Sequence, residues 1–410
     1  MDQSHSASTK NSTKHTTSTT SDSKSKNINR YDAIVIGAGS VGVPIALNLA
    51  EAGEKVLVID KNPSVGQGEN KHAIGGIRAT HSERAKIITA MRSLEIVSTW
   101  EQLYGDNIEW VEGGYLFVVY RDQDEKTLKS LLHLQQSYGL KIDWIEPTEV
   151  QEIVPGMNSK GLLGGTYSPN DGNLSPLLLI NAYERRCLES GVEFKFKETV
   201  TDVIKNRTTV KGVVTDKNRY SSDFVINAAG ATASEIAGMA DIDISVQPES
   251  HEAGITEPVK RFFNPMVVDI RPVKGSKNYY FYQNALGQII FCLTPSPPIL
   301  GTDKRATSEF LPQIAKRMVD LLPRLKYIKV RRTWRGLYPM TPDGGPLVGE
   351  AEGLSGFIIA AGMCGQGLML GPGLGELVGR LVMDKLTRQD VHVLKGFALD
   401  RDFSKAEVLK

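Results

Sequence analysis

The sequence is short of cysteine, of net charge and of long apolar runs, and each shortage excludes a class of protein. Three cysteines occur in 410 residues and none lies in a C-x-x-C spacing, so neither a zinc site nor a disulfide framework is indicated. The 48 basic and 47 acidic residues nearly cancel, which gives no basic surface for nucleic acid. No stretch reaches the roughly 20 consecutive apolar residues of a membrane-spanning helix. The composition favours an enzyme of the reducing cytoplasm without a metal site.

Residues 1–30 are also short of apolar side chains, since only Met1, Ala7 and Ile28 are apolar. Such a segment cannot bury enough surface to offset its ordering entropy, so we predict a disordered tail over residues 1–30. It has neither the apolar core of a secretory signal nor the Arg-rich pattern of a transit peptide. The rest of the chain is long enough to bury a large core, which we expect to divide into two domains.

The stretch from Tyr31 to Asp60 is the strongest pattern in the chain. A short apolar run, residues 33–36, indicates a buried strand, and Gly37, Gly39 and Gly42 follow it as G-x-G-x-x-G. In a dinucleotide site the first glycine allows a tight turn, the second lets the backbone approach a pyrophosphate, and the third lets the helix pack on the strand. The N–H groups at the start of that helix then face the phosphate charge.

The continuation of this stretch supports the same interpretation. An apolar helix is expected up to Gly53, and a second apolar run, residues 56–59, ends in Asp60, which lies 18 positions after Gly42. A carboxylate at that distance suits a hydrogen bond from ribose hydroxyls. The glycine motif alone is weak evidence, because a glycine-rich turn would also produce it. Strand, glycines, helix, strand and acid in this order favour a dinucleotide site.

Further along, the pattern changes twice. Helices are predicted over 82–103 and around 128–134, and strands are predicted at 115–120 and 161–167. A further helix is expected from Ser175, as its N-cap, to about Ser190. Strands follow this helix at 192–196 and 224–226. The strand–helix pattern of the opening thus resumes after an insertion, which indicates interleaved domains. The next segment is predicted to contain strands at 266–270, 278–282 and 288–293, followed by a loop at prolines 295, 297 and 298. The prediction ends with a helix over 310–322, a strand at 357–361 and a last helix to about residue 385.

Five motifs together resemble the FAD-dependent D-amino-acid oxidase superfamily, and most of all its sarcosine oxidase β-type and dye-linked L-proline dehydrogenase β-type chains. They are VIGAGSVG (35–42), GGIR (75–78), VINAAGA (225–231), GLYPMTPDGGPLVG (336–349) and GMCGQGLMLGPG (362–373), and the resemblance extends from residue 31 to about 390. It implies an α/β (α+β overall) fold, in which a Rossmann-like FAD-binding domain of glutathione-reductase type is interleaved with an antiparallel-sheet substrate domain. The expected FAD-binding segments are 31–84, 160–243 and 333–395, and the expected substrate segments are 85–159 and 244–332.

The resemblance also implies a bound FAD and the residues that hold it. Some sarcosine oxidases attach flavin through a cysteine in the loop before TPD, but the corresponding residues 336–340 contain none, so the cofactor is expected to be non-covalent. Relatives more often have Glu at the position of Asp60, and many have Ser-Gly-His-Gly where this chain has Cys-Gly-Gln-Gly. The matching positions are Gly37, Gly39, Ser40, Val41, Gly42, Asp60, Lys61, Gly75, Gly76, Ile77, Val200, Ala228, Ala229, Gly230, Leu337, Gly362, Met363, Gly365, Gln366, Gly367, Leu368 and Met369.

The substrate residues implied by the resemblance are Arg78, Tyr280, Tyr282 and Gln366. Arg78 matches an arginine that faces the substrate carboxylate in monomeric sarcosine oxidases, and a guanidinium holds a carboxylate in a fixed two-point geometry. The alternative is an arginine that pairs with a surface acid or a flavin phosphate. The two tyrosines share one face of a strand, with packing in the sheet as their alternative role. The lysine that assists in sarcosine oxidases falls at Met369.

The reaction implied is hydride transfer from the α C–H of a small amino acid or secondary amine to flavin N5, which gives an imine that water hydrolyses. Oxygen, a quinone-like carrier or a partner subunit would then accept the electrons. Two alternatives remain open. The chain could oxidise a 2-hydroxy acid, since the second anchor is absent, or it could be a flavin-bearing assembly or partner subunit with little turnover. Tyr338 replaces an arginine of glycine oxidases, which argues against that subfamily.

Overall fold

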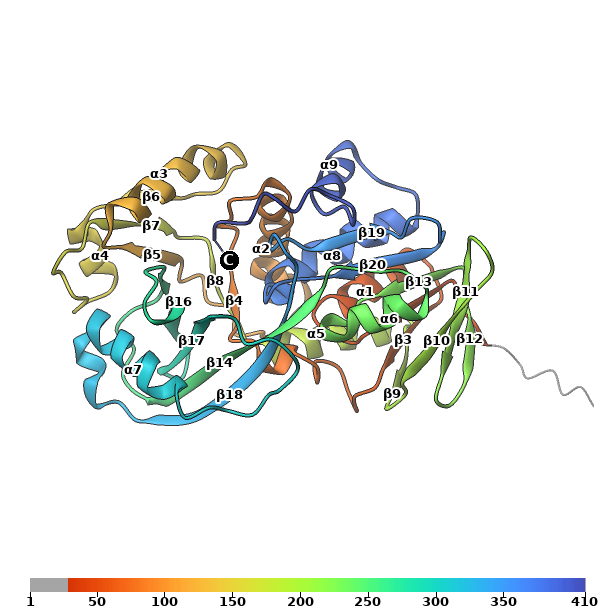
Figure 1. Ribbon diagram of the computed structural model, residues 1–410, viewed down its shortest axis with the longest axis horizontal. Coiled ribbons are helices and arrows are strands. Elements are labelled where there is room, and N and C mark those ends of the chain that lie inside the picture. Colours follow the sequence, from red (N-terminus) through yellow and green to blue (C-terminus); the bar gives the residue numbers. More distant parts are fainter. Residues whose placement is uncertain (1–28, 410) are drawn as a thin grey trace, which may run out of the picture.

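The computed structural model describes residues 29–409 as an elongated molecule with a large sheet in each half (Figure 1). In one half, a six-stranded sheet has the order β19-β20-β13-β2-β3-β9. All neighbouring strands are parallel except β19, which runs antiparallel to β20. The strands are β2 (Ala33–Ile36), β3 (Val56–Asp60), β9 (Glu193–Phe196), β13 (Phe224–Asn227), β19 (Leu347–Glu350) and β20 (Phe357–Ala361).

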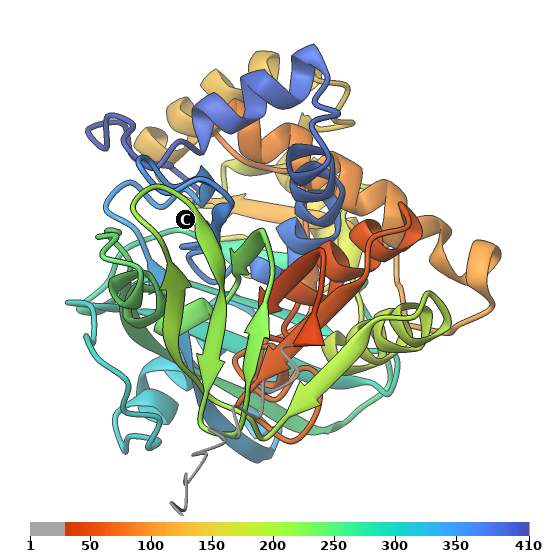
Figure 2. The ribbon, with the colours of Figure 1, turned by 90° about the vertical axis from the view of Figure 1, so that its right-hand side faces the viewer.

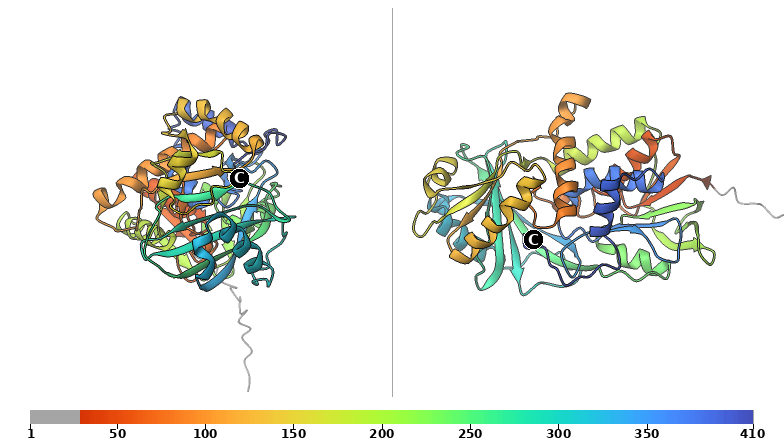
Figure 3. Two further views of the ribbon diagram at one scale, coloured as in Figure 1. Left: turned by 90° about the vertical axis from the view of Figure 1, so that its left-hand side faces the viewer. Right: turned by 90° about the horizontal axis from the view of Figure 1, so that it is seen from above.

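Both faces of this sheet are covered, which explains why its central strands are continuous apolar runs and not alternating ones. One face packs against helices α1 (Gly42–Glu51), α2 (Arg84–Tyr104), α5 (Pro176–Glu189) and α8 (Gly367–Val382) in the largest hydrophobic core. Helix α9 (Arg388–Gly396) lies against α2. The view from above shows α2 standing between the two halves of the molecule (Figure 3).

The opposite face packs against a smaller sheet at the end of the molecule, seen from its own side in Figure 2. This sheet has the order β1-β12-β11-β10 and is accompanied by α6 (Ala233–Met239). Its strands are β1 (Asn29–Arg30), β10 (Val200–Lys205), β11 (Val210–Thr215) and β12 (Arg219–Ser221). The pair β4 (Gly76–Ile77) and β8 (Gly172–Asn173) links this half to the other.

The other half contains an eight-stranded sheet in the order β18-β14-β17-β16-β15-β5-β7-β6, antiparallel except for the pair β15 and β5. Helices α4 (Pro147–Ile153) and α7 (Phe310–Leu321) cover one face, and α3 (Asp122–Ser137) packs on β5 and β7. The strands are β5 (Tyr115–Val119), β6 (Asp143–Ile145), β7 (Gly164–Ser168), β14 (Gln247–Pro258), β15 (Met266–Asp269), β16 (Gly275–Gln283), β17 (Gln288–Ser296) and β18 (Val330–Met340). Three short 3₁₀ segments are Asn70–His72, Gly230–Thr232 and Pro323–Tyr327.

The mixed fold and the predicted long elements are confirmed, with four corrections. The segment 336–340 is the end of β18 and not a loop, and Pro295 lies within β17, because a strand near its end tolerates the missing N–H. The last helix ends at Val382 and α9 follows it. Asn29 and Arg30 form β1 and so do not belong to a disordered tail, whereas residues 1–28 lie outside the described residues.

The division into FAD-binding and substrate segments stays a prediction. Strands β7 and β18, which that division assigns to the FAD-binding part, hydrogen-bond within the eight-stranded sheet. Within residues 29–409, no helix combines the length and the apolar character that crossing a bilayer requires.

The packing of α8 on the first glycine turn yields a prediction. A Cβ added at Gly371 would lie 1.8 Å from the carbonyl oxygen of Ser40, so Gly371→Ala must push the two segments apart. We expect a loss of about 1–3 kcal/mol in the free energy of unfolding together with weaker flavin retention. A Cβ at Gly238 in α6 meets nothing within 4 Å, so the control Gly238→Ala should be neutral or stabilising. Urea unfolding measures both variants, and equal stability of the two would contradict the packing argument.

Candidate functional site

The first element of the site is the region at the carboxyl ends of β2 and β13, which we name the cofactor crevice after the ligand sites of α/β sheets. The chain leaves β2 toward β3 on one side, while β13 and β20 lie on the other, and α/β sheets bind ligands at such a switch point. Gly37 has φ +111°, and an added Cβ would lie 2.4 Å from the carbonyl oxygen of Ala228, so the turns after the two strands touch. A Cβ at Gly39 or at Gly230 would meet nothing within 4 Å. The backbone at these two positions therefore faces open space.

The third wall of the crevice is the loop 362–366 and the start of α8. Gly362, Cys364 and Gly365 have positive φ angles of 69°, 49° and 79°, so the loop is tightly coiled. A Cβ at Gly365 would lie 2.2 Å from the ring of Tyr338, and a Cβ at Gly367 would lie 3.3 Å from Ser40 Oγ. The loop is thus held between a tyrosine of the eight-stranded sheet and the first glycine turn.

The donor groups of this crevice fit an anionic, polar cofactor. Neither α1 nor α8 receives a side-chain cap from any described residue, and neither has an acidic residue in its first turn. The free N–H groups and the positive ends of both helices are then available to phosphate or to a reduced ring. The side chain of Gln366 is buried, and its Oε1 has no hydrogen-bond partner among the described residues. A ligand that donates a hydrogen bond would satisfy it.

Asp60 has a role that its position in the sequence did not reveal. Its Oδ2 accepts a hydrogen bond from Ala38 N at 2.8 Å, and its Oδ1 accepts from Asn62 N at 2.7 Å and Asn62 Nδ2 at 2.9 Å. The carboxylate therefore ties the glycine turn to the end of β3. A carboxylate offers about four lone-pair sites, so the predicted contact with ribose remains compatible with this geometry.

The other predicted cofactor residues are spread around the crevice, and their roles stay predictions. Lys61 is exposed after β3, and Val200 is the buried first residue of β10. The N–H group of Leu337 donates to Glu69 Oε2 at 2.7 Å and is thus already engaged. Several remaining positions belong to the main hydrophobic core: Val41, Ile77, Ala228, Met363, Leu368 and Met369.

Arg78 leaves β4 toward the junction of the two halves, and only 6% of it is exposed. Its guanidinium donates to the carbonyl oxygen of Thr80 through Nη1 and to that of Leu409 through Nη2 at 2.5 Å. Nη1 also lies 3.2 Å from His81 Nδ1. These three contacts involve Nη1 and Nη2, and none of them uses the Nε–H group. Arg78 is therefore held in place by backbone carbonyls and keeps donor capacity for a ligand.

The tyrosines face the same junction from the eight-stranded sheet. Tyr280 and Tyr282 share one face of β16, as predicted, while Tyr279 and Phe281 pack on the other. Tyr282 donates to the carbonyl oxygen of Ile74 at 2.5 Å, which places it against the loop before Gly75. This face joins Tyr115, Phe117 and Leu409 in one cluster of buried side chains.

The hydroxyl groups of Tyr280 and Tyr338 lie 2.7 Å apart. The ring of His251 stacks on Tyr338 with a centroid distance of 3.8 Å. Burial raises the pKa of both tyrosines, so each stays a neutral hydroxyl. The sequence did not predict this tyrosine pair or its histidine, since β16, β18 and β14 are brought together only by the sheet.

Asp171 supports the loop that carries Arg78. It is fully buried, and it accepts hydrogen bonds from Ala79 N at 3.0 Å and from Thr80 Oγ1 at 2.7 Å. Burial raises its pKa to about 6, although these hydrogen bonds and the charge of Arg78 oppose the rise. From the sequence alone Asp171 indicates no more than a turn, because it directly precedes a glycine.

Two further buried charges, Lys86 and Glu407, were also missed. Lys86 could have been found, because it lies four residues before Ala90 and eight before Leu94 on the buried face of α2. Nothing in the local sequence marks Glu407. Within residues 29–409, no group of three or more His, Cys, Asp or Glu side chains is arranged to hold a metal ion.

Comparison with known proteins identifies the family and the fold. The sequence profile of the family described as FAD dependent oxidoreductase (DAO) matches residues 32–381. Among solved structures, L-proline dehydrogenase from P. horikoshii superposes with a TM-score of 0.84 at 33% identity, over 90% of this chain and 98% of that one. The match confirms the resemblance inferred from the five motifs.

Two curated relatives differ in length. Glycine oxidase of Geobacillus kaustophilus is 25% identical over 92% of this chain and 99% of its own length. Mitochondrial sarcosine dehydrogenase of Mus musculus is 25% identical over 88% of this chain, but the match covers 40% of its own length. The chain thus spans about two fifths of the sarcosine dehydrogenase that it resembles.

The raised pKa of Asp171 predicts a dependence of stability on pH. In the unfolded chain its pKa is about 3.9, so between pH 4 and pH 6 the folded protein binds a proton that the unfolded chain does not. The stability contributed by this proton is complete below about pH 4 and is lost as pH rises to 6, by up to about 3 kcal/mol.

Asp171→Asn removes this titration. The free energy of unfolding of the variant minus that of the native protein should rise between pH 4 and pH 6 and should stay constant above pH 6. Urea unfolding across this range tests the shape, with Asp143→Asn, at an exposed position, as the control. A difference that does not change with pH would contradict the buried, protonated carboxyl.

Proposed function

Since the chain belongs to the DAO family of FAD dependent oxidoreductases, we propose that it oxidises the C–N bond of a small amino acid or secondary amine with non-covalently bound FAD. The observation that carries this proposal is the position of Arg78. A buried guanidinium lies at the junction of the cofactor crevice and the tyrosine face, with an Nε–H group left for a ligand. A substrate with a carboxylate beside its amine would satisfy it.

The residues around Arg78 suit a small amino acid that binds with its carboxylate charged and its amine uncharged. The face of β16 and β5 supplies aromatic and aliphatic side chains, so a charged ammonium would lose its hydration there. Binding therefore favours the neutral amine, whose lone pair assists loss of a hydride from the neighbouring carbon. No dedicated base is required, which agrees with the neutral tyrosines of this face.

When bound, FAD supplies a two-electron acceptor for that hydride. The chain supplies orientation: Arg78 fixes the carboxylate end, and the tyrosine face fixes the side of the α-carbon that is presented. The coiled loop 362–366 and the uncapped start of α8 supply N–H groups and a positive dipole, which stabilise negative charge in the crevice.

The acceptor of the electrons and the location of the protein belong to the same proposal. We infer that oxygen, a quinone-like carrier or a partner subunit reoxidises the flavin, and comparison of aerobic with anaerobic turnover separates the first from the others. The three cysteines form no disulfide, which fits a reducing compartment such as the cytoplasm.

The first test is the flavin itself. The purified protein should be yellow, and denaturation in acid should release all of its FAD into the supernatant. Anaerobic addition of proline, sarcosine, glycine or a D-amino acid should bleach the flavin with one of them. Flavin that stays with the precipitated chain would contradict non-covalent binding. Bleaching by a 2-hydroxy acid, or by no compound without added partner proteins, would favour the alternatives.

The second test is Arg78. A charged bidentate hydrogen bond is worth about 1.5–3 kcal/mol, so Arg78→Ala should lower kcat/KM by roughly one to two orders of magnitude. Arg78→Lys keeps the positive charge but cannot form two parallel hydrogen bonds to a carboxylate, so it should recover only part of the activity. Arg84→Ala, at the exposed first residue of α2, is the control. Full activity of Arg78→Ala on a carboxylate substrate would place the anchor elsewhere, and simple loss of FAD would favour a cofactor role.

A further inference from the structure

The segment after α9 returns to the site and is tied down along its length. Arg401 donates to both carboxylate oxygens of Asp343, at 2.7 and 2.8 Å, and to the carbonyl oxygen of Pro346 at 2.7 Å. Farther along, the N–H group of Glu407 donates to the carbonyl oxygen of Asp343 at 2.8 Å. The segment therefore runs along residues 341–345, from the start of β19 to the junction of the two halves.

Glu407 is the main tie at the inner end. Its Oε1 accepts hydrogen bonds from Ser82 N at 2.9 Å, Ser82 Oγ at 2.6 Å and Leu409 N at 2.9 Å. The N–H group of Val408 donates in turn to Ser82 Oγ at 2.9 Å. One carboxylate oxygen thus organises the backbone of the segment against the loop before α2.

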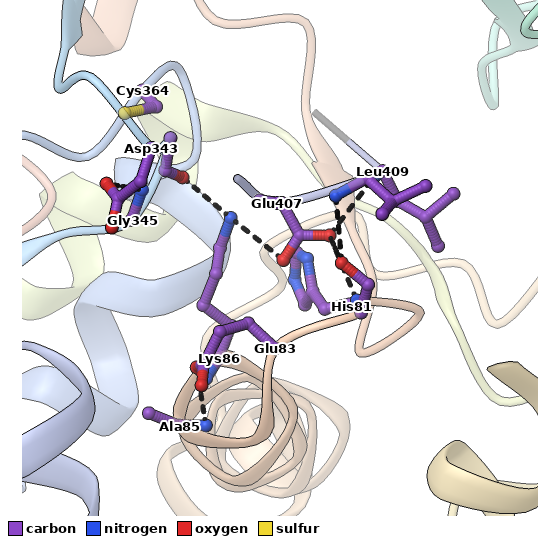
Figure 4. Close-up of polar contacts among 12 residues, drawn as sticks. His81, Glu83, Ala85, Lys86, Asp343, Gly345, Cys364, Glu407 and Leu409 are labelled. Atoms are coloured by element: carbon purple, nitrogen blue, oxygen red, sulfur yellow. Dashed lines mark hydrogen bonds and ion pairs between the residues drawn. The ribbon is translucent and has the colours of Figure 1, made fainter. Parts of the chain in front are cut away.

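The other carboxylate oxygen faces a buried lysine, as Figure 4 shows. Oε2 of Glu407 has no hydrogen bond to the described residues, and Lys86 Nζ lies 3.5 Å from it. Lys86 is fully buried and donates to the carbonyl oxygen of Gly344 at 3.0 Å. Burial lowers the pKa of Lys86, and the charge of Glu407 opposes that effect. The two charges compensate each other where water does not reach them.

Leu409 shows what this tie positions. Its side chain is buried in the cluster that contains Tyr282, Tyr115 and Phe117, and its carbonyl oxygen accepts from Arg78 Nη2. The neighbouring Val408 is 56% exposed. The segment is therefore a single layer of chain, with solvent on one side and the residues proposed to bind substrate on the other.

We propose that Lys86 and Glu407 are a positioning pair that holds segment 407–409 closed over Arg78, so that the segment forms one wall of the proposed substrate site. This inference rests on the proposed function, since it assigns the wall to that same site. The closed segment excludes water from the guanidinium and strengthens its attraction for a carboxylate. Lys86 donates to the carbonyl oxygen of Gly344, and Glu407 accepts from Ser82 and Leu409, so neither side chain hydrogen-bonds to Arg78. We therefore expect the pair to act on how tightly substrate binds more than on how fast the bound substrate reacts.

A buried ion pair responds to substitution differently from ordinary packing. Removal of one partner from a buried ion pair leaves an uncompensated charge, whereas neutralising both partners is close to neutral. Glu407→Gln keeps an acceptor for Ser82 and Leu409 but leaves Lys86 unpaired, which should favour the open segment. The double variant Lys86→Met/Glu407→Gln carries no unpaired charge and should close again.

The first measurement needs no substrate. Hydrogen–deuterium exchange of amides 407–409 reports opening directly, and in Glu407→Gln it should be about tenfold faster or more, with recovery in the double variant. The matched control is Glu83→Gln at the same helix start, where Glu83 Oε2 accepts from Ala85 N at 2.7 Å and does not touch the segment. Unchanged exchange in Glu407→Gln would overturn the proposal.

The second measurement is the split between KM and kcat with the amine that bleaches the flavin. Glu407→Gln should raise KM by about tenfold or more and leave kcat within about twofold, and the double variant should restore KM. Perturbation of flavin absorbance by acetate gives a dissociation constant that should weaken in parallel. If kcat, KM and flavin content all deteriorate together and the double variant recovers none of them, the pair is merely structural and the proposal fails.

The two proposals fail in different ways. If no amine bleaches the flavin, the proposed function is wrong, while exchange and acetate binding still decide whether the pair holds the segment closed. If an amine reacts but its KM is the same in native protein and Glu407→Gln, the function stands and the positioning pair is refuted.

Discussion

The structure depends on three close backbone contacts at glycine positions where a Cβ would find no room. Gly37 lies against Ala228, Gly42 against the carbonyl oxygen of Gly37, and Gly371 against the carbonyl oxygen of Ser40. Because these contacts leave no room for side chains, α1 and α8 pack directly on each other and both begin at the same crevice. Their positive ends therefore converge on one place, which is the electrostatic basis of the cofactor site.

A second close approach joins this crevice to the eight-stranded sheet. A Cβ at Gly76 would lie 1.9 Å from the hydroxyl oxygen of Tyr115, so the loop that carries Arg78 rests against the face formed by β5 and β16. Asp171, Thr80 and Leu409 then hold this loop and its guanidinium through hydrogen bonds. The proposed substrate site is thus built at the seam between the two sheets, from side chains of both halves.

Much of the fold could be predicted because its central strands are buried on both faces and its long helices carry apolar residues at helical spacing. Ser175 caps α5 as expected, and β2, β3, β13 and β20 are the four predicted apolar runs. The strands β10–β12 escaped prediction, because half-exposed strands alternate and theirs contain Lys, Asp and Arg. Residues 336–340 were expected to form a loop because of the resemblance to sarcosine oxidases, whereas their pairing with β14 makes them the end of β18.

The sequence by itself determined the strand, glycine turn and helix of residues 33–51, because the G-x-G-x-x-G turn acts through the local backbone. That the glycine turn meets Ala228 and α8 was decided by the tertiary structure. It also determined that Tyr280 and Tyr282 share a face, which follows from the two-residue period of a strand. Only the tertiary structure decided that Tyr338 meets Tyr280, that Asp171 supports the Arg78 loop, and that Lys86 meets Glu407. These partners lie far apart in the chain, and a buried charge or hydroxyl takes its role from whatever the packing places opposite it.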